Sequence, residues 1–446
     1  MQKMNKEYAT YLQELVKQAG LVDKNRKVFG AEKHDYQLKP VISLSEVQAY
    51  EQKHNIKLPS EYVFFITQVG NGGAGPFYGI YGIHIAKDYL YYTKSGTPFL
   101  SSKLTKDVWA EKLAPMDDDD CPDEIFEQIE EEILQGTTSI GTQGCSDETL
   151  AIAEGAEENR IFYINNDWNT EGMPFDTKTT FLEWYENFFK EIIIGNSVSN
   201  YGYYKIQTQQ QAIQTFSSTN DKAEQSDCLN SFLRFPKLEQ KTIDFIQALS
   251  DDDFPAHKLL LLLRYDTKNG LQLFDTFLTE KPKVAISASI SVPKECLPYY
   301  YDKFLHTLYT MEDGSKKCSS FSSYHDVLLY RLQDCPQFKA KDIIPFLDKK
   351  GISDSDLRTA LYTLCNAKDK IDYIDRFIDY MLHGSYHVAH TALQSISNVS
   401  HPALKEICPV LWEKYTDSWM RSNLKILCNT NGVPIPIEKK QKGLPK

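Results

Sequence analysis

Residues 44–73 read LSEVQAYEQKHNIKLPSEYVFFITQVGNGG, and this stretch decides the fold of the N-terminal half. A first helix can begin after Ser43, because Glu46, three residues later, completes a capping box. Leu58-Pro59 then opens a second helix, since proline suits a first helical position. The apolar stripe of this second helix follows helical spacing, and glycines end it in a turn. The stripe and the exit comprise Tyr62, Phe65, Ile66, Val69 and Gly70–Gly73.

Three further blocks follow in order along the chain. Thr138–Gly141 leads to Gly144-Cys145, and both Thr149–Ile152 and Arg160–Ile164 have the composition of strands. Thr180–Phe189 has the pattern of a final helix. Together with the two helices, these blocks resemble the SUKH superfamily, the Smi/Knr-type domains, over roughly residues 1–195. The resemblance implies a binding module, because bacterial members are mostly immunity proteins that sit on a toxin domain, and others are regulatory or scaffold domains.

Composition narrows the class of protein. The chain has 446 residues, of which 41% are hydrophobic, enough for two to three soluble domains. No stretch approaches 18 uncharged apolar residues, and the first residues lack the apolar centre of a secretory signal. Nine cysteines occur singly without a CxxC pair, which is typical of reduced thiols. We therefore expect a cytoplasmic protein without a membrane segment.

The acidic residues are concentrated in the first half. The net charge is −12, and residues 1–200 contain 18 Lys and Arg against 32 Asp and Glu. Residues 107–132 hold twelve acids and a single base, Lys112. Such a field repels nucleic acid and attracts basic partners, so we expect a protein partner and no nucleic acid. The alternative is a solvated acidic loop and helix without a role in recognition.

The acidic block and nearby aromatic residues supply the candidate partner-binding residues. Tyr and Trp are over-represented at interface centres, although Tyr also fills half-buried strand positions. The candidates are Asp117, Asp118, Asp119, Asp120, Glu124, Glu127, Glu131, Tyr81, Tyr91 and Trp109.

The pattern changes along the chain and predicts two domains. We expect an α+β domain over residues 1–198, with helices against a mostly antiparallel sheet. A polar linker is predicted at 199–226, because this stretch is rich in Gln, Ser and Thr. An all-α helical-repeat domain is predicted at 227–430, followed by a disordered Pro-, Gly- and Lys-rich tail at 431–446.

Helical repeats are indicated by similar apolar segments in the second half. The segments at Val327, Leu357 and Val388 start about 30 to 32 residues apart, as expected of stacked helix pairs. His387–Tyr415 resembles a HEAT-type repeat, in which His401-Pro402 opens the second helix. An irregular helical bundle is the alternative.

Motifs that would carry catalysis or bind a metal are weak. Asp167–Gly172 mimics the start of a calcium loop, but Lys178 stands where a bidentate Glu is required. Cys145 would need a nearby His base to be a nucleophile, and a tight turn explains the same residues. Four histidines lie close together in the sequence and fit either a metal site or repeat corners: His383, His387, His390 and His401. We therefore predict no catalytic residue, no metal and no cofactor.

The expected function is the binding and neutralisation of a cognate, basic protein toxin domain by direct contact. The alternative is a regulatory scaffold that recruits different partners through its two halves. An enzyme that uses the His-rich region or Cys145 is a third hypothesis. The sequence leaves the oligomeric state open.

Overall fold

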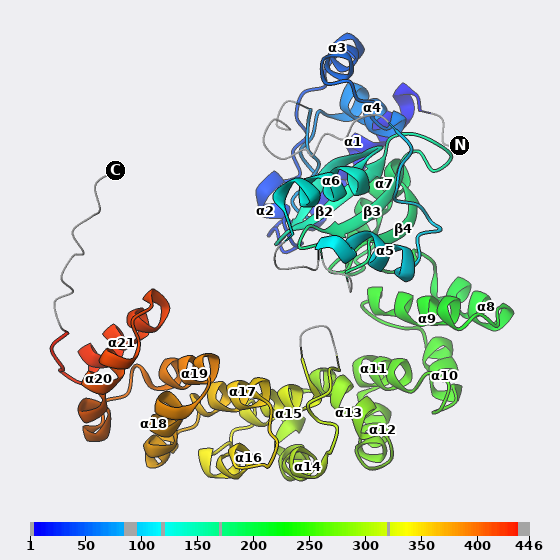
Figure 1. Cartoon of the computed structure of the whole chain (residues 1–446). Coiled ribbons are helices and arrows are strands. Elements are labelled where there is room, and N and C mark those ends of the chain that lie inside the picture. Colours follow the sequence, from blue (N-terminus) through cyan, green and yellow to red (C-terminus); the bar gives the residue numbers. More distant parts are fainter. Residues whose placement is uncertain (1–3, 84–95, 117–120, 169–171, 319–321, 436–446) are drawn as a thin grey trace, which may run out of the picture. The chain divides into compact units, whose positions relative to one another are not determined.

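The structure is a computed structural model of the chain, and it describes residues 4–83, 96–116, 121–168, 172–318 and 322–435. The chain divides into two compact units, Met1–Thr242 and Ile243–Lys446 (Figure 1). Each unit has a hydrophobic core of its own. The two units are therefore packed around separate hydrophobic cores.

A four-stranded antiparallel sheet forms the centre of the first unit, with strand order β1-β2-β3-β4. Successive side chains of a strand point to opposite faces. Ala151 and Ile161 accordingly join one apolar cluster, whereas Leu150 and Phe162 join another. Because both faces are covered, apolar residues follow one another without alternation at Leu150–Ile152 of β2 and Ile161–Ile164 of β3. The strands are β1 (Thr137–Gly144), β2 (Asp147–Ile152), β3 (Arg160–Asn165) and β4 (Phe175–Thr180).

Helices cover both faces of this sheet (Figure 1). The larger cluster holds residues of α1, α4, η1 and α7, and the smaller one holds residues of α5 and α6. The predicted α+β architecture, with helices against an antiparallel sheet, is confirmed. The helices are α1 (Lys6–Val22), α2 (Ala31–His34), α3 (Leu44–His54), α4 (Ser60–Phe64), η1 (Phe65–Val69), α5 (Lys106–Leu113), η2 (Ala114–Met116), α6 (Asp123–Leu134) and α7 (Phe181–Ile193).

The stretch that decides the fold forms two helices and a turn. Ser43 caps α3, and Glu46 completes the predicted capping box. The second helix begins one residue later than expected, because Pro59 is its N-cap, and it ends in the π-helical turn η1. Its predicted stripe is buried throughout, at 0–2% exposure. The stripe consists of Tyr62, Phe65, Ile66 and Val69.

The predicted linker at 199–226 differs from the observed structure, because it lies within the first unit. It contains α8 (Gln209–Ser218) and the first half of α9 (Lys222–Ser231), which is followed by η3 (Phe232–Arg234). Arg234 Nε lies 3.3 Å from Glu191 Oε2 of α7, and both side chains are about 95% buried, at 4% and 5% exposure. Arg234 also donates to the carbonyls of Lys205 and Gln207 at 3.0 Å each. The segment is therefore held by a buried ion pair and its hydrogen bonds.

We propose that the boundary of independent folding lies near residue 240. A fragment of residues 1–239 is expected to melt cooperatively, because it keeps the contact between Arg234 and Glu191. A fragment ending at Val198 lacks the Arg234 partner of Glu191, although the Asn196 amide still donates to this carboxylate at 3.1 Å, so its melting temperature is expected to be lower by at least about 5 °C. Circular dichroism melting of both fragments measures this difference. Equal melting temperatures would show that the first folding unit ends at residue 198.

The second unit is all helical in the residues described, as predicted. The sequence pattern predicts a helix over Pro402–Lys414, and α20 begins and ends at these residues. The helices are α10 (Gln240–Ala248, across the boundary), α11 (Pro255–Tyr265), α12 (Thr267–Glu280), α13 (Pro282–Ala288), η4 (Ser289–Ser291), η5 (Lys294–Cys296), α14 (Leu297–Thr310), α15 (Tyr324–Gln333), η6 (Ala340–Asp342), α16 (Ile344–Leu347), α17 (Asp354–Leu364), η7 (Lys370–Tyr373), α18 (Ile374–His383), α19 (Tyr386–Ile396), α20 (Pro402–Lys414) and α21 (Ser418–Thr430).

A regular register links α15, α17, α19 and α21. Hydrogen bonds join the alternate helices α16, α18 and α20: Tyr380 of α18 donates to the carbonyl of Leu347 at 3.2 Å, and Tyr415, at the end of α20, to that of Met381 at 2.7 Å. These contacts support stacked helix pairs, while the HEAT-type assignment stays a prediction. Buried side chains recur every 32 residues in two series, Leu328, Ala360, Ala392, Leu424 and Leu332, Leu364, Ile396, Cys428.

The C-terminal tail starts later than the predicted residue 431. Asn431 is buried, and its amide nitrogen donates to the carbonyl of Val399 at 3.0 Å. Residues 436–446 lie outside the described part of the chain. Among the helices that are described, none combines the length and the apolar composition needed to cross a membrane.

Candidate functional site

The exposed face of α6 carries the described part of the predicted acidic block. Glu124, Glu127 and Glu131 are exposed on it, while Ile129 and Ile133 pack into the smaller core. The same helix exposes two apolar side chains, Ile125 at 41% and Phe126 at 37%. This face therefore combines acidic and apolar side chains. The predicted Asp117, Asp118, Asp119 and Asp120 lie outside the described residues.

The aromatic candidates fall into different environments. Trp109 is fully buried, and its ring centroid lies 6.4 Å from that of Trp168, so its prediction as a partner contact is corrected. Trp109 and Leu113 stand four residues apart on α5 and both face the sheet, which makes Trp109 a core residue. Tyr81 is half-buried, and Tyr91 lies outside the described residues.

A hollow that the sequence did not predict lies beside the edge strand β4 of the first unit. We call it the β4 groove: one wall is β4 with the start of α7, and the other is residues 201–206 with α9. Its volume is about 720 Å³, within the range of ligand sites in proteins. The two walls come from separate segments of sequence, so no local motif marks the groove.

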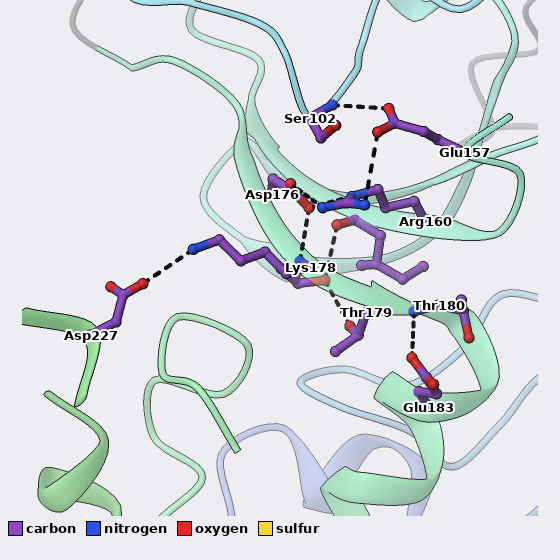
Figure 2. Close-up of polar contacts among 11 residues, drawn as sticks. Ser102, Glu157, Arg160, Asp176, Lys178, Thr179, Thr180, Glu183 and Asp227 are labelled. Carbon is purple, nitrogen blue, oxygen red and sulfur yellow. Dashed lines mark hydrogen bonds and ion pairs between the residues drawn. The ribbon is translucent and has the colours of Figure 1, made fainter. Parts of the chain in front are cut away.

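A bulge in β4 shapes one wall of the β4 groove. The register between β3 and β4 shifts between Arg160 and Phe162, and Lys178 has a positive φ of 60°. Asp176 stabilises this bulge: Arg160 donates to its two oxygens at 2.8 and 2.7 Å, and the backbone nitrogen of Lys178 donates to Oδ1 at 2.8 Å (Figure 2). Bulges of this kind redirect side chains at sheet edges.

An ion pair joins the two walls. The Lys178 ammonium lies 3.1 Å from Asp227 Oδ2 of α9, and Figure 2 shows this side chain reaching away from β4. Both partners are open to solvent, with side-chain exposures of 67% and 42%. Lys205 and Glu224, which both belong to the second wall, make a longer pair at 3.6 Å.

Aromatic side chains line part of the β4 groove. The ring centroids of Phe175 and Tyr203 are 4.8 Å apart, and these side chains are 36% and 40% exposed. Burial, together with the nearby Asp147 carboxylate, raises the pKa of Tyr203, so this phenol is neutral at physiological pH. Gly202 has a φ of 83°, and a Cβ there would lie 2.2 Å from the Tyr163 hydroxyl, so only glycine lets the loop pass.

Carboxylates outnumber bases around the β4 groove. Its lining includes five acids and two lysines, and even with Arg160 added the acids exceed the bases by two. Asp176 is paired with Arg160, and the two lysines are paired with Asp227 and Glu224. Charge complementarity therefore favours a cationic ligand. The five acids are Asp176, Glu183, Asp221, Glu224 and Asp227.

Several residues considered for catalysis or metal binding make structural contacts, whereas residues 169–171 of the predicted calcium loop lie outside the described residues. Cys145 and Ser146 form the two-residue turn between β1 and β2, both with positive φ, which confirms the predicted tight turn. His383 pairs with Asp379 at 3.0 Å, and His401 caps α20. In the described part of the chain, no three His, Cys, Asp or Glu residues are arranged to hold a metal.

A buried Ser-His-Asp group in the second unit does not have the geometry of a catalytic triad. His325 Nδ1 lies 3.2 Å from Asp356 Oδ2, and Ser315 Oγ donates to the same oxygen at 2.5 Å. In a triad the serine would face the other ring nitrogen. Although burial alone would raise the pKa of Asp356, hydrogen bonds from His325 and Ser315 hold it below its usual value. The group ties α15 to the start of α17.

The comparisons with known proteins identify the central part of the first unit. Residues 41–187 match the SMI1 / KNR4 family (SUKH-1), whereas no curated protein and no solved structure matches the chain. The matched stretch includes β4 and half of α7, but not residues 201–206 or α9. The second wall of the β4 groove is therefore an addition to the matched stretch. The chain thus contains a SMI1 / KNR4-type (SUKH-1) domain at residues 41–187.

Proposed function

We propose that this chain is an immunity-type protein that binds a basic protein toxin domain and neutralises it. The observation that carries the proposal is that the half with the SUKH-1 domain also carries all of the net acidity. A field of one sign accelerates encounter with an oppositely charged partner. The immunity protein would cover the active site of the toxin domain and so keep the substrate out. This kind of neutralisation needs no catalysis by the immunity protein.

Co-expression tests the proposal. The chain is produced together with a basic, toxin-like protein encoded beside its gene, and growth and co-purification are measured. Restored growth and a stable complex at physiological salt are the expected results. Continued toxicity without a complex would contradict the proposal for that partner. In this function the protein acts in the cytoplasm of the cell that it protects.

The acidic face of α6 is expected to steer association. Replacing Glu124, Glu127 and Glu131 by Gln is expected to lower the on-rate about tenfold at low salt and less at high salt. Screening explains the salt effect, because charges more than about 8 Å apart are largely screened at physiological ionic strength. Stopped-flow association across a salt series measures it.

A matched control removes the same charge elsewhere. Glu280, Glu406 and Glu413 are exposed on α12 and α20, so their replacement by Gln changes the net charge equally. This control is expected to keep nearly the wild-type on-rate. If both triple variants slow association equally, the total charge matters and the α6 face has no particular role.

A regulatory scaffold is the second candidate function. The observation that favours it is a row of exposed residues on α15, α17 and α21, which lie at the spacing of the 32-residue register. Extended faces of stacked helices suit protein partners. The discriminating result is a protein that co-purifies with the second half of the chain and not with the first. The row comprises Tyr330, Tyr362 and Ile426.

A further inference from the structure

We propose that Lys178 occupies, in the free protein, the place that a lysine or arginine side chain of the basic partner takes in the β4 groove. This inference rests on the proposed function, from which it takes the positive charge of the partner. It adds where on this protein the partner binds and which side chain it inserts. Lys178 then competes with the partner's side chain for Asp227. On binding, the ion pair between Lys178 and Asp227 breaks, and the partner's cation pairs with Asp227 in its place.

The backbone of β4 is built to present this lysine. A non-glycine residue with φ of 60° is unfavourable within a strand, and such conformations persist where the surroundings hold them. Asp176 supplies the hold, since it accepts from the Lys178 backbone nitrogen while Arg160 binds both of its oxygens (Figure 2). The Lys178 side chain therefore reaches α9 from a position that a regular strand would not give it.

The ion pair of Lys178 and Asp227, which bridges the two walls of the β4 groove, is weak enough for a partner's cation to replace Lys178. Ion pairs between exposed side chains are weak, because water screens them and long side chains lose freedom in forming them. The side chains of Lys178 and Asp227 are 67% and 42% exposed. A partner's cation can replace the ammonium at the Asp227 carboxylate at little cost.

A cationic side chain of the partner can make contacts in the β4 groove that Lys178 does not make. Glu183 and Asp221 line the same groove. From the residues that the structure describes, each accepts a hydrogen bond from a backbone nitrogen of its own helix turn, Thr180 and Ala223 respectively. The exposed ring faces of Phe175 and Tyr203 line it too, and aromatic faces attract cations. Arginine fits best, since its planar fork donates to carboxylates in pairs and stacks on rings.

The probe for the test is the capped tripeptide acetyl-Gly-Arg-Gly-amide, with the citrulline peptide as an uncharged control of nearly equal shape. Binding to the full chain is followed by saturation-transfer NMR at low salt. We expect the arginine peptide to bind and the citrulline peptide not to bind. The Lys178→Gln variant is expected to bind about two- to fivefold more tightly, because the competitor is gone.

Removing the acidic partner of Lys178 is expected to weaken peptide binding. Asp227→Asn is expected to weaken binding of the arginine peptide about fivefold, and Lys178→Arg to leave it at the wild-type level. The matched control is the pair of Lys283 and Asp313 in the second unit, 3.0 Å apart with 47% and 44% exposed side chains. Lys283→Gln and Asp313→Asn change the net charge equally and are expected to leave binding unchanged.

The inference is overturned if Lys178→Gln does not bind the arginine peptide more tightly, if Asp227→Asn binds as well as wild type, or if the citrulline peptide binds equally. Thermal melting of each variant confirms that it is folded. The peptide experiment needs no toxin, so it separates the two proposals. A toxin complex that is indifferent to both groove variants removes only this site, whereas peptide binding without any toxin complex removes only the immunity function.

Discussion

Replacing Phe65 by alanine is expected to lower the free energy of unfolding of the first unit by about 3–5 kcal/mol. Phe65 is fully buried in the turn η1, and its ring centroid lies 5.5 Å from that of Phe181 and 4.8 Å from that of Tyr185. The substitution removes apolar contacts with two rings of α7 and leaves a cavity that the surrounding helices cannot fill. Chemical denaturation followed by tryptophan fluorescence measures the loss.

The control for Phe65 is Leu44, which belongs to the same stretch of sequence. Leu44 is 53% exposed at the start of α3, so Leu44→Ala is expected to change the free energy of unfolding by no more than about 0.5 kcal/mol. A Phe65→Ala variant as stable as Leu44→Ala would show that η1 does not pack against α7 in solution.

Replacing Glu191 or Arg234 alone is expected to destabilise the first unit by about 3–5 kcal/mol, because the remaining charge stays buried without its partner. Burial raises the pKa of Glu191 and lowers that of Arg234, although the charge of each partner acts in the opposite direction. Desolvation therefore dominates this pair. Glu191→Leu and Arg234→Met, each measured by denaturant unfolding, test the expectation.

The double variant Glu191→Leu/Arg234→Met distinguishes the ion pair from general packing. It is expected to be less destabilised than the sum of the two single variants by about 0.5–3 kcal/mol, since it removes both charges together. It does not return to wild type, because the carbonyls of Lys205 and Gln207 lose their donor. Strictly additive losses would mean that the two charges do not interact.

Helices with a clear apolar stripe were predictable from sequence, and those without one were not. The stripe of Tyr62 and Phe65 and the helix from Pro402 to Lys414 were read correctly. The segment 199–226 was read as a linker, because it is rich in Gln, Ser and Thr and has few apolar side chains, and it is anchored by Arg234 instead. The helix α21 carries a regular stripe and was missed; its members are Met420, Leu424, Leu427 and Cys428.

Composition identified the acidic half but not which side chains a partner can reach. Trp109 and Glu127 both lie within or beside the acidic block, yet one is fully buried and the other is exposed. Which faces of α5 and α6 meet the sheet decides this difference. Local spacing shows that Trp109 and Leu113 share a face, but only the packed sheet shows that this face points inward.

The sequence by itself determined the SUKH-type resemblance, the change from mixed to helical structure and the acidic first half, because caps, periodicity and charge are local properties. Only the tertiary structure decided the β4 groove. Lys178 and Asp227 stand 49 residues apart and belong to segments of different pattern. They meet because the pair of Glu191 and Arg234 holds the segment after α7 against the domain, and because a bulge turns one lysine out of its strand. Both causes are contacts between distant residues, which spacing along the chain does not record.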